Sequence, residues 1–248
     1  MIADILTVMW KEAKGLFRYQ GSLRTVLLNL LVPAGMLGIF LPWQEGRDWV
    51  SSPLALIGAA LIPALLVGMK IPDSFAGERE RHTLGTLLAS RLPDRAILFG
   101  KVFAAIAYGW GMAMVVLLIG LVTVNVAHWE GQLLLYSPTI ALAGAVLSLL
   151  VAVLMAGAGV LISLRSATVQ AATQTLLFAV LVVPMILQVA FMFALGAGPE
   201  GNALIRQILG TLGSPQVVLT FFAALALVDV ALLLAATARF QRARLILD

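Results

Sequence analysis

Six long runs of apolar residues divide the chain. They lie near residues 25–43, 54–72, 102–127, 139–164, 169–195 and 216–238. Each run approaches or exceeds the roughly 20 residues that a helix needs to cross a bilayer. Polar and apolar positions do not alternate within the runs, as they would in the strands of a membrane barrel, and a backbone in lipid must satisfy its own hydrogen bonds. The pattern therefore predicts an all-α, multi-pass membrane protein with six membrane-spanning helices.

Residues 1–24 differ from these runs because polar and apolar positions recur there at helical spacing. The apolar positions are Ile2, Ile5, Leu6, Met9, Ala13, Leu16 and Phe17. Lys11, Lys14 and Arg18 fall largely on the opposite side. This pattern is typical of an amphipathic helix that lies in the membrane interface, although the residues could also form only the flank of the first span. We therefore divide the chain into an N-terminal interfacial helix and a six-helix membrane domain over residues 25–248.

The composition agrees with a membrane protein. The 248 residues are 61% hydrophobic and 11% charged, with a mean hydropathy of +1.03, whereas a soluble domain is usually about 45–50% apolar and about 25% charged. The chain has no cysteine, which excludes disulfides and thiolate metal sites. The net charge is +4, and the basic residues flank apolar runs. Their expected partner is therefore the anionic face of a lipid bilayer and not nucleic acid.

The basic residues also predict the orientation in the membrane. Fourteen of the 16 Lys and Arg residues precede the first run, lie at the end of the second run or between it and the third, follow the fourth run or lie in the C-terminal tail. The other three loops hold only Arg47 and Arg206. Because cytoplasmic loops carry the excess of Lys and Arg, both termini and residues 73–100 should be cytoplasmic. We expect a multi-pass protein of the plasma membrane, which is the inner membrane in a bacterium.

One internal segment concentrates the charge. Residues 77–101, GERERHTLGTLLASRLPDRAILFGK, hold eight of the 28 charged residues. Asp73 and Ser74 can cap a helix here, and Pro93 ends the pattern, so we expect a short helix along the cytoplasmic surface. Such a helix displays both signs of charge beside an apolar edge, which suits a groove on a soluble protein better than lipid headgroups. The alternative is a solvated loop whose charges only fix topology.

A stripe of small residues marks the fourth run, where one recurs at every fourth position. The stripe consists of Gly144, Ser148, Ala152 and Ala156. Small residues allow another helix to approach closely, so we expect a helix-packing face. The neighbouring helix could belong to this chain or to a second copy.

Sequence motifs for catalysis are absent. The chain contains no G-x-x-x-x-G-K-[ST], no H-E-x-x-H and no G-x-S-x-G, which are the signatures of phosphate binding, zinc proteases and serine hydrolases. His82 and His128 fall in loops on predicted opposite sides of the membrane, so they cannot share a metal ion. We therefore expect neither an enzyme nor a metal site in this chain.

Asp229 is a lone acidic residue near the middle of the sixth run. An ionised Asp there costs about 2.5–3.5 kcal/mol on insertion scales. It could line a substrate path, or it could pack against a neighbouring helix through a hydrogen bond. A path residue would suit an ion-gradient-driven secondary transporter or a channel, but we find no similarity between the first three and the last three runs of the kind that inverted repeats would give. A scaffold without transport activity is a third possibility.

The charged segment resembles the cytoplasmic loop of type-2 ATP-binding-cassette (ABC) exporter permeases. That family has a pattern of the kind E-R-E-x-G-T-L-E-x-L-L-x-x-P…R…G-K, which is matched here by Glu78, Arg79, Glu80, Thr83, Leu84, Leu87, Leu88, Arg95, Gly100 and Lys101. His82 stands where the family often has Gly, Gly85 stands where it often has Glu, and the proline is displaced to Pro93. The interfacial helix, the six spans and the cytoplasmic termini extend the resemblance over the whole chain.

The resemblance implies the permease subunit of an ATP-driven exporter. Two permease copies, identical or closely related, would pair with two cytoplasmic ATPase subunits, which would bind ATP and magnesium, so this chain itself would carry no cofactor. The charged helix would be the coupling helix, seated in a groove of the ATPase, and its movement would tilt the first two spans. The residues that the resemblance assigns to this docking are Glu78, Arg79, Glu80, Arg81, His82, Thr83, Leu84, Leu87 and Leu88.

Overall fold

Helices form all the regular structure in the described part of the chain. The computed structural model describes residues 1–17, 31–83, 85, 91–129, 131–196 and 214–240. The elements are α1 (Ile2–Phe17), the π-helical turn η1 (Met36–Phe40), α3 (Leu41–Glu45), α4 (Arg47–Ser51), α5 (Ala55–Glu80), α7 (Asp94–Ala127), α8 (Pro138–Ser163), α9 (Val169–Gly196) and α11 (Pro215–Arg239). The predicted all-α class is therefore confirmed.

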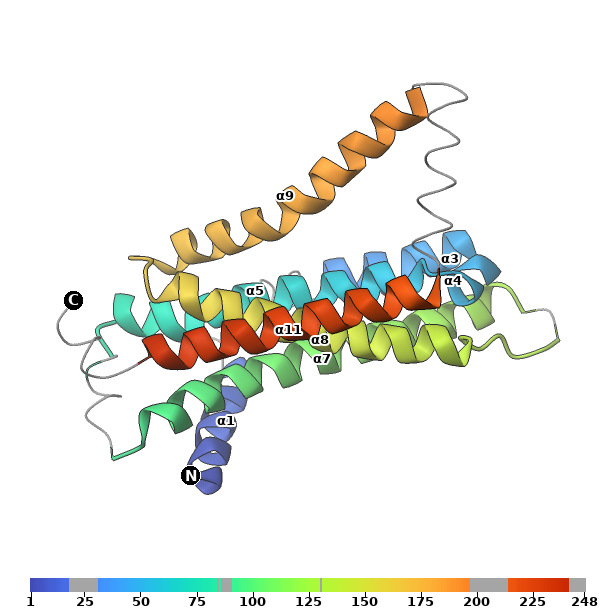
Figure 1. Cartoon of the computed structure of the whole chain (residues 1–248). Helices are drawn as coiled ribbons and strands as arrows, with labels where there is room; N and C mark the ends of the chain where they lie inside the picture. The colour runs from blue at the N-terminus through green and yellow to red at the C-terminus, as the bar shows by residue number, and fades with distance from the viewer. Residues whose placement is uncertain (18–30, 84, 86–90, 130, 197–213, 241–248) are drawn as a thin grey trace.

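Four of these helices are long and apolar enough to cross a membrane, namely α5, α7, α8 and α11. They lie side by side in one bundle, in which α5 packs against α7 and α8, and α8 also packs against α11 (Figure 1). The helix α9 contacts α5 and α8, and its C-terminal part diverges from the bundle. Of the predicted first span, residues 25–30 lie outside the described residues. The count of six spans therefore stays a prediction.

The boundaries of the last three predicted spans agree closely with α8, α9 and α11. Serine–proline pairs explain the sharp starts of two of these helices. The hydroxyls of Ser137 and Ser214 accept hydrogen bonds from the N–H groups of Ile140 and Val217, and a proline follows each serine in the first turn. Serine is a preferred N-cap, and proline is preorganised for the first helical position.

The largest differences from the predicted boundaries lie around the charged segment. The helix α5 does not end near residue 72 but continues to Glu80, and α7 begins at Asp94 and not near residue 102. Asp73 and Ser74 therefore lie inside α5, and the predicted helix start at these residues is wrong. The reason is packing, because Phe75 is buried among the core residues and such contacts sustain a helix beyond its lipid-compatible run. Residues 84 and 86–90 of the predicted surface helix lie outside the described residues.

The small-residue stripe of α8 packs against α5 of the same chain. Gly144, Ser148, Ala152 and Ala156 are all buried, and a Cβ on Gly144 would lie 3.6 Å from the side chain of Leu56 in α5 and 3.5 Å from that of Leu117 in α7. The predicted packing face is thus confirmed, and its neighbour is within the chain. A similar close approach joins α1 to α7, since a Cβ on Gly100 would lie only 2.5 Å from Cβ of Val8.

The first helix, α1, lies across α7 rather than along it (Figure 1). Val8 and Glu12 face the bundle and are buried, whereas Ile2, Leu6 and Trp10 are exposed. A helix over the predicted amphipathic segment is therefore confirmed for residues 2–17. Its place in the membrane interface stays a prediction.

Candidate functional site

The acidic–basic–acidic triplet of residues 78–80 forms the last turn of α5. Arg79 donates hydrogen bonds from Nη2 to the carbonyl oxygen of Leu164 (3.0 Å) and from Nη1 to that of Ser166 (3.2 Å). Leu164 is the C-cap of α8. The last carbonyls of a helix lack partners within the helix and carry partial negative charge, so the guanidinium stabilises the end of α8.

Glu80 binds the start of the next helix, whereas Arg79 binds the end of the preceding one. Its Oε2 accepts a hydrogen bond from the backbone N–H of Val169 (3.1 Å), the first residue of α9. The first N–H groups of a helix are unpaired and favour negative charge, so the carboxylate stabilises the start of α9. Two neighbouring residues of α5 therefore hold both sides of the short link between α8 and α9.

Glu78 belongs to a buried ionic cluster, which we call the Lys101 cluster and which consists of Glu12, Ser74, Glu78 and Lys101. The side chain of Lys101 is 2% exposed. Its ammonium donates to Oε1 of Glu12 (2.9 Å), to the carbonyl oxygen of Ser74 (2.9 Å) and to Oε1 of Glu78 (3.2 Å). An ammonium has three donors, and each has an acceptor here. The cluster joins α1, α5 and α7 at one point.

Lys11 approaches the same cluster from the surface. Its Nζ lies 3.6 Å from Oε1 of Glu78, and its side chain is 60% exposed. Two carboxylates and two ammonium groups thus meet where α1 crosses the bundle. Because the formal charges balance, the cluster can remain ionised with little solvent.

The residues that follow the triplet form an exposed turn. Arg81 bonds to Asp73 within the same helix and has a side chain that is 59% exposed. His82 adopts a left-handed conformation with φ of 57° just past the end of α5, and Thr83 hydrogen-bonds Glu78 through both its backbone and its hydroxyl. Glycine is favoured at this position after a helix. His82 is the position at which the permeases that the segment resembles often have glycine.

Comparison with protein families decides which group of proteins this architecture belongs to. The family model described as "ABC-2 family transporter protein" matches residues 18–245, which is most of the chain. The chain belongs to the ABC-2 transporter family. A search of the curated proteins finds no match.

Membership in the ABC-2 family confirms the resemblance that the charged segment indicated. The chain is a membrane permease protein of the ABC transporter class, and the four long apolar helices agree with a multi-pass membrane protein. The family implies an ABC ATPase as the partner of such a chain.

The structure separates the predicted docking residues of this ABC-2 permease into two groups. Glu78 and Arg79 are largely turned toward other helices, and the side chain of Glu78 is 14% exposed. The other described docking residues are exposed, namely Glu80, Arg81, His82 and Thr83. Leu84, Leu87 and Leu88 lie outside the described residues. Contact of any of these residues with the ATPase stays a prediction.

The sequence pattern did not indicate the partners of the triplet or of Lys101. Glu12 is the clearest case, since it is an acidic residue on the face of α1 that also carries the buried Val8. An acid on a packing face is a usable signal, because a buried carboxylate needs a cationic partner. The carbonyl groups of Leu164 and Ser166 give no such signal, since every residue has one.

Asp229 is buried at 3% exposure in α11. Neither of its carboxylate oxygens has a hydrogen-bond partner among the described residues. The hydrogen bond to a neighbouring helix that the sequence allowed is therefore not provided by the described part of the chain. Among the same residues, no group of three acidic or histidine side chains could hold a metal ion.

Proposed function

We propose that the chain is the permease subunit of an ATP-driven exporter whose ATPase docks at the inner end of α5. The observation that carries this proposal is that each residue of the triplet binds a different part of the chain. Glu78, Arg79 and Glu80 bind, in that order, the α1–α7 crossing, the end of α8 and the start of α9. A displacement of the last turn of α5 would therefore act on four other helices together.

The docking surface consists of the exposed residues beside this turn. Glu80, Arg81, His82 and Thr83 lie at or just after the end of α5. Arg91 and Arg95 are exposed just before and at the start of α7. Mixed charges of this kind give an interface specificity and orientation. Two ATPase subunits would bind two permease copies, with residues 73–100 and both termini in the cytoplasm. Family membership gives no support to the ion-gradient alternative based on Asp229.

The test is purification of the tagged permease in mild detergent from its native cells, followed by identification of bound P-loop ATPases by mass spectrometry. We expect an ABC ATPase to copurify, and we expect the Arg81→Glu/Arg91→Glu variant to lose it. Both arginines are exposed, so the variant should reach the membrane at normal abundance.

The matched control is Arg239→Glu, which reverses an exposed arginine at the end of α11 and should keep the ATPase. A second comparison is Arg79→Ala, which removes the inward contacts to the end of α8. This variant should keep the ATPase but show a changed rate of ATP hydrolysis in nanodiscs. Retention of the ATPase by the Arg81→Glu/Arg91→Glu variant would refute the assignment of the docking surface.

A further inference from the structure

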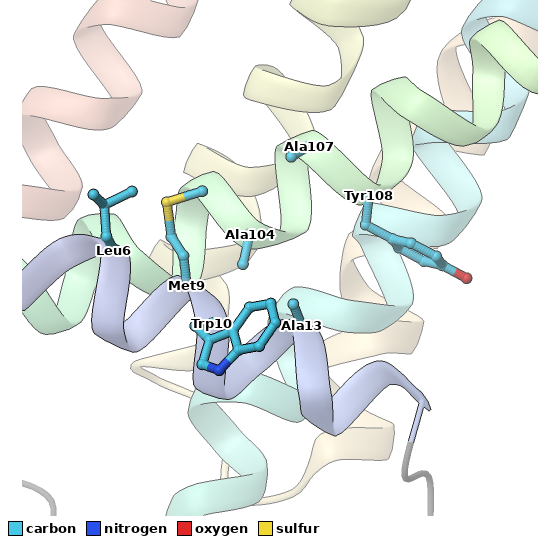
Figure 2. A pocket seen from close by; sticks show the side chains of 7 residues that line it. All are labelled: Leu6, Met9, Trp10, Ala13, Ala104, Ala107 and Tyr108. Carbon is cyan, nitrogen blue, oxygen red and sulfur yellow. The ribbon is translucent and has the colours of Figure 1, made fainter.

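An apolar groove of about 380 Å³ lies between α1 and α7. Figure 2 shows Met9, Trp10 and Ala13 of α1 on one side of the groove, and Ala104, Ala107 and Tyr108 of α7 on the other. None of the residues that line it is charged. None of these residues belongs to the proposed docking surface, so a ligand in the groove does not depend on the docking of an ATPase.

The groove arises from the way the two helices cross. They touch at Gly100 and Val8, where there is no room for a Cβ on the glycine, and they diverge beyond this point (Figure 2). Tyr108 lies eight residues after Gly100 in α7, which is about 12 Å along a helix axis at 1.5 Å per residue. The groove therefore leads from the crossing toward the apolar middle of a membrane-spanning helix.

The surface around the groove suits lipid and not water. Trp10 is 64% exposed and Leu6 is 58% exposed, and both line the groove. Large apolar side chains on the face of an interfacial helix insert among acyl chains. Trp10 and Tyr108 are also the residue types that gather at the headgroup level of a bilayer.

A basic group stands at the edge of the groove. The ammonium of Lys14 lies 5.0 Å from the centre of the Trp10 ring. Lys14 follows Trp10 by four residues, so both lie on the same face of α1. An exposed lysine beside an apolar groove is complementary to a ligand with an anionic head and an apolar tail.

We propose that this groove binds an acyl chain of an anionic phospholipid, whose headgroup is bound by Lys14. A zwitterionic phospholipid offers the same acyl chain but no net charge for the ammonium. The headgroup charge therefore separates a specific site from ordinary contact with the bilayer.

Quenching of Trp10 fluorescence by brominated lipids tests the proposal, because bromine quenches tryptophan only at short range. The full-length protein is placed in phosphatidylcholine nanodiscs with rising fractions of brominated phosphatidylglycerol or brominated phosphatidylcholine. The Trp10 signal is the difference between the wild type and Trp10→Phe. We expect saturable quenching by phosphatidylglycerol at about fivefold lower fractions than by phosphatidylcholine, since one lysine near an anionic lipid contributes about that factor.

Two variants and a control define the site. Lys14→Gln should remove the fivefold preference and keep the quenching, because it changes only an exposed charge. Ala107→Phe should fill the groove from its exposed position in α7 and abolish the Trp10 signal. Ala224→Phe makes the same change at an exposed position of α11 and should leave the signal intact.

Three results would overturn the proposal. Equal quenching by both lipids that rises without saturation would show ordinary bilayer contact. Absence of Trp10 quenching by either lipid would show that another segment, such as residues 18–30 or a second copy, covers the groove. An unchanged signal in Ala107→Phe would show that the lipid binds elsewhere near Trp10.

Discussion

Replacing Lys101 by Met should strongly destabilise the permease. The substitution keeps an unbranched side chain of similar length but removes the ammonium that binds Glu12, Ser74 and Glu78. The buried carboxylate of Glu12 and the part-buried carboxylate of Glu78 are then left without the ammonium that neutralised them. Removing one partner of a buried ion pair costs about 3–5 kcal/mol, which is a large share of the roughly 5–15 kcal/mol that stabilises a typical folded protein.

Thermal unfolding in detergent at pH 7 measures this loss. At about 2–4 °C per kcal/mol for a chain of this size, the Lys101→Met midpoint should fall by about 6–20 °C. The matched control is Lys11→Met, which removes an exposed ammonium from the same carboxylate of Glu78. Exposed pairs contribute about 0–1 kcal/mol, so the control should stay within a few degrees of the wild type.

A compensating variant separates the charge effect from the loss of packing. In Lys101→Met/Glu12→Gln/Glu78→Gln, both carboxylates become neutral amides, so no unpaired charge remains buried. Replacing all members of a buried ionic group is far less costly than removing one, and the triple variant should recover at least half of the lost midpoint. The reasoning is refuted if Lys101→Met melts with the wild type, or if the triple variant is no more stable than Lys101→Met.

Three further predictions address the orientation, α11 and the turn after α5. In this cysteine-free chain, an impermeant thiol reagent should label Leu133→Cys on intact cells but label Gly85→Cys only after lysis, and the reverse pattern would invert the orientation. Asp229→Leu should raise the unfolding free energy by about 1–3 kcal/mol, because a buried carboxyl without a partner costs that much, and a lower midpoint in detergent would point to a partner outside the described residues. His82→Gly should stabilise the protein by up to about 1 kcal/mol and His82→Val should destabilise it, since left-handed backbone favours glycine, and equal melting of both variants would contradict the assigned conformation.

The sequence predicts the bounds of α8, α9 and α11 well because each of these helices begins and ends close to the limits of an apolar run. In the structure Ser137 and Ser214 are the N-caps of α8 and α11, and the apolar runs end where the helices end. At the C-terminal end of α5 these limits separate. Hydropathy falls after residue 72, but the helix continues to Glu80 because it packs against other helices. Such packing cannot be predicted from the hydropathy of the segment.

The candidate site could be located from the sequence, but its contacts could not. The pattern identified residues 77–101 as a special segment, and three of its charged residues, 78–80, prove to bind other parts of the chain. Half of their partners are backbone groups, such as the carbonyl of Leu164 and the N–H of Val169. Backbone groups are the same at every position, so no residue pattern could have indicated them. Glu12, which binds Lys101, is the member of the Lys101 cluster that a search for acids on packing faces could have found.

The contacts of the triplet differ in strength, and this difference sets how motion would spread from α5. Lys101 is buried, so pulling it away from Glu12 and Glu78 would leave charged groups without partners, at a cost of several kcal/mol. The contact of Glu80 with Val169 is exposed, and an exposed hydrogen bond can be replaced by water at little cost. A force on the last turn of α5 should therefore move α1, α5 and α7 as one unit. Among the contacts of the triplet, the hydrogen bond of Glu80 to Val169 is the one that can open and close during such a movement, while the two hydrogen bonds of Arg79 keep the end of α8 attached to α5.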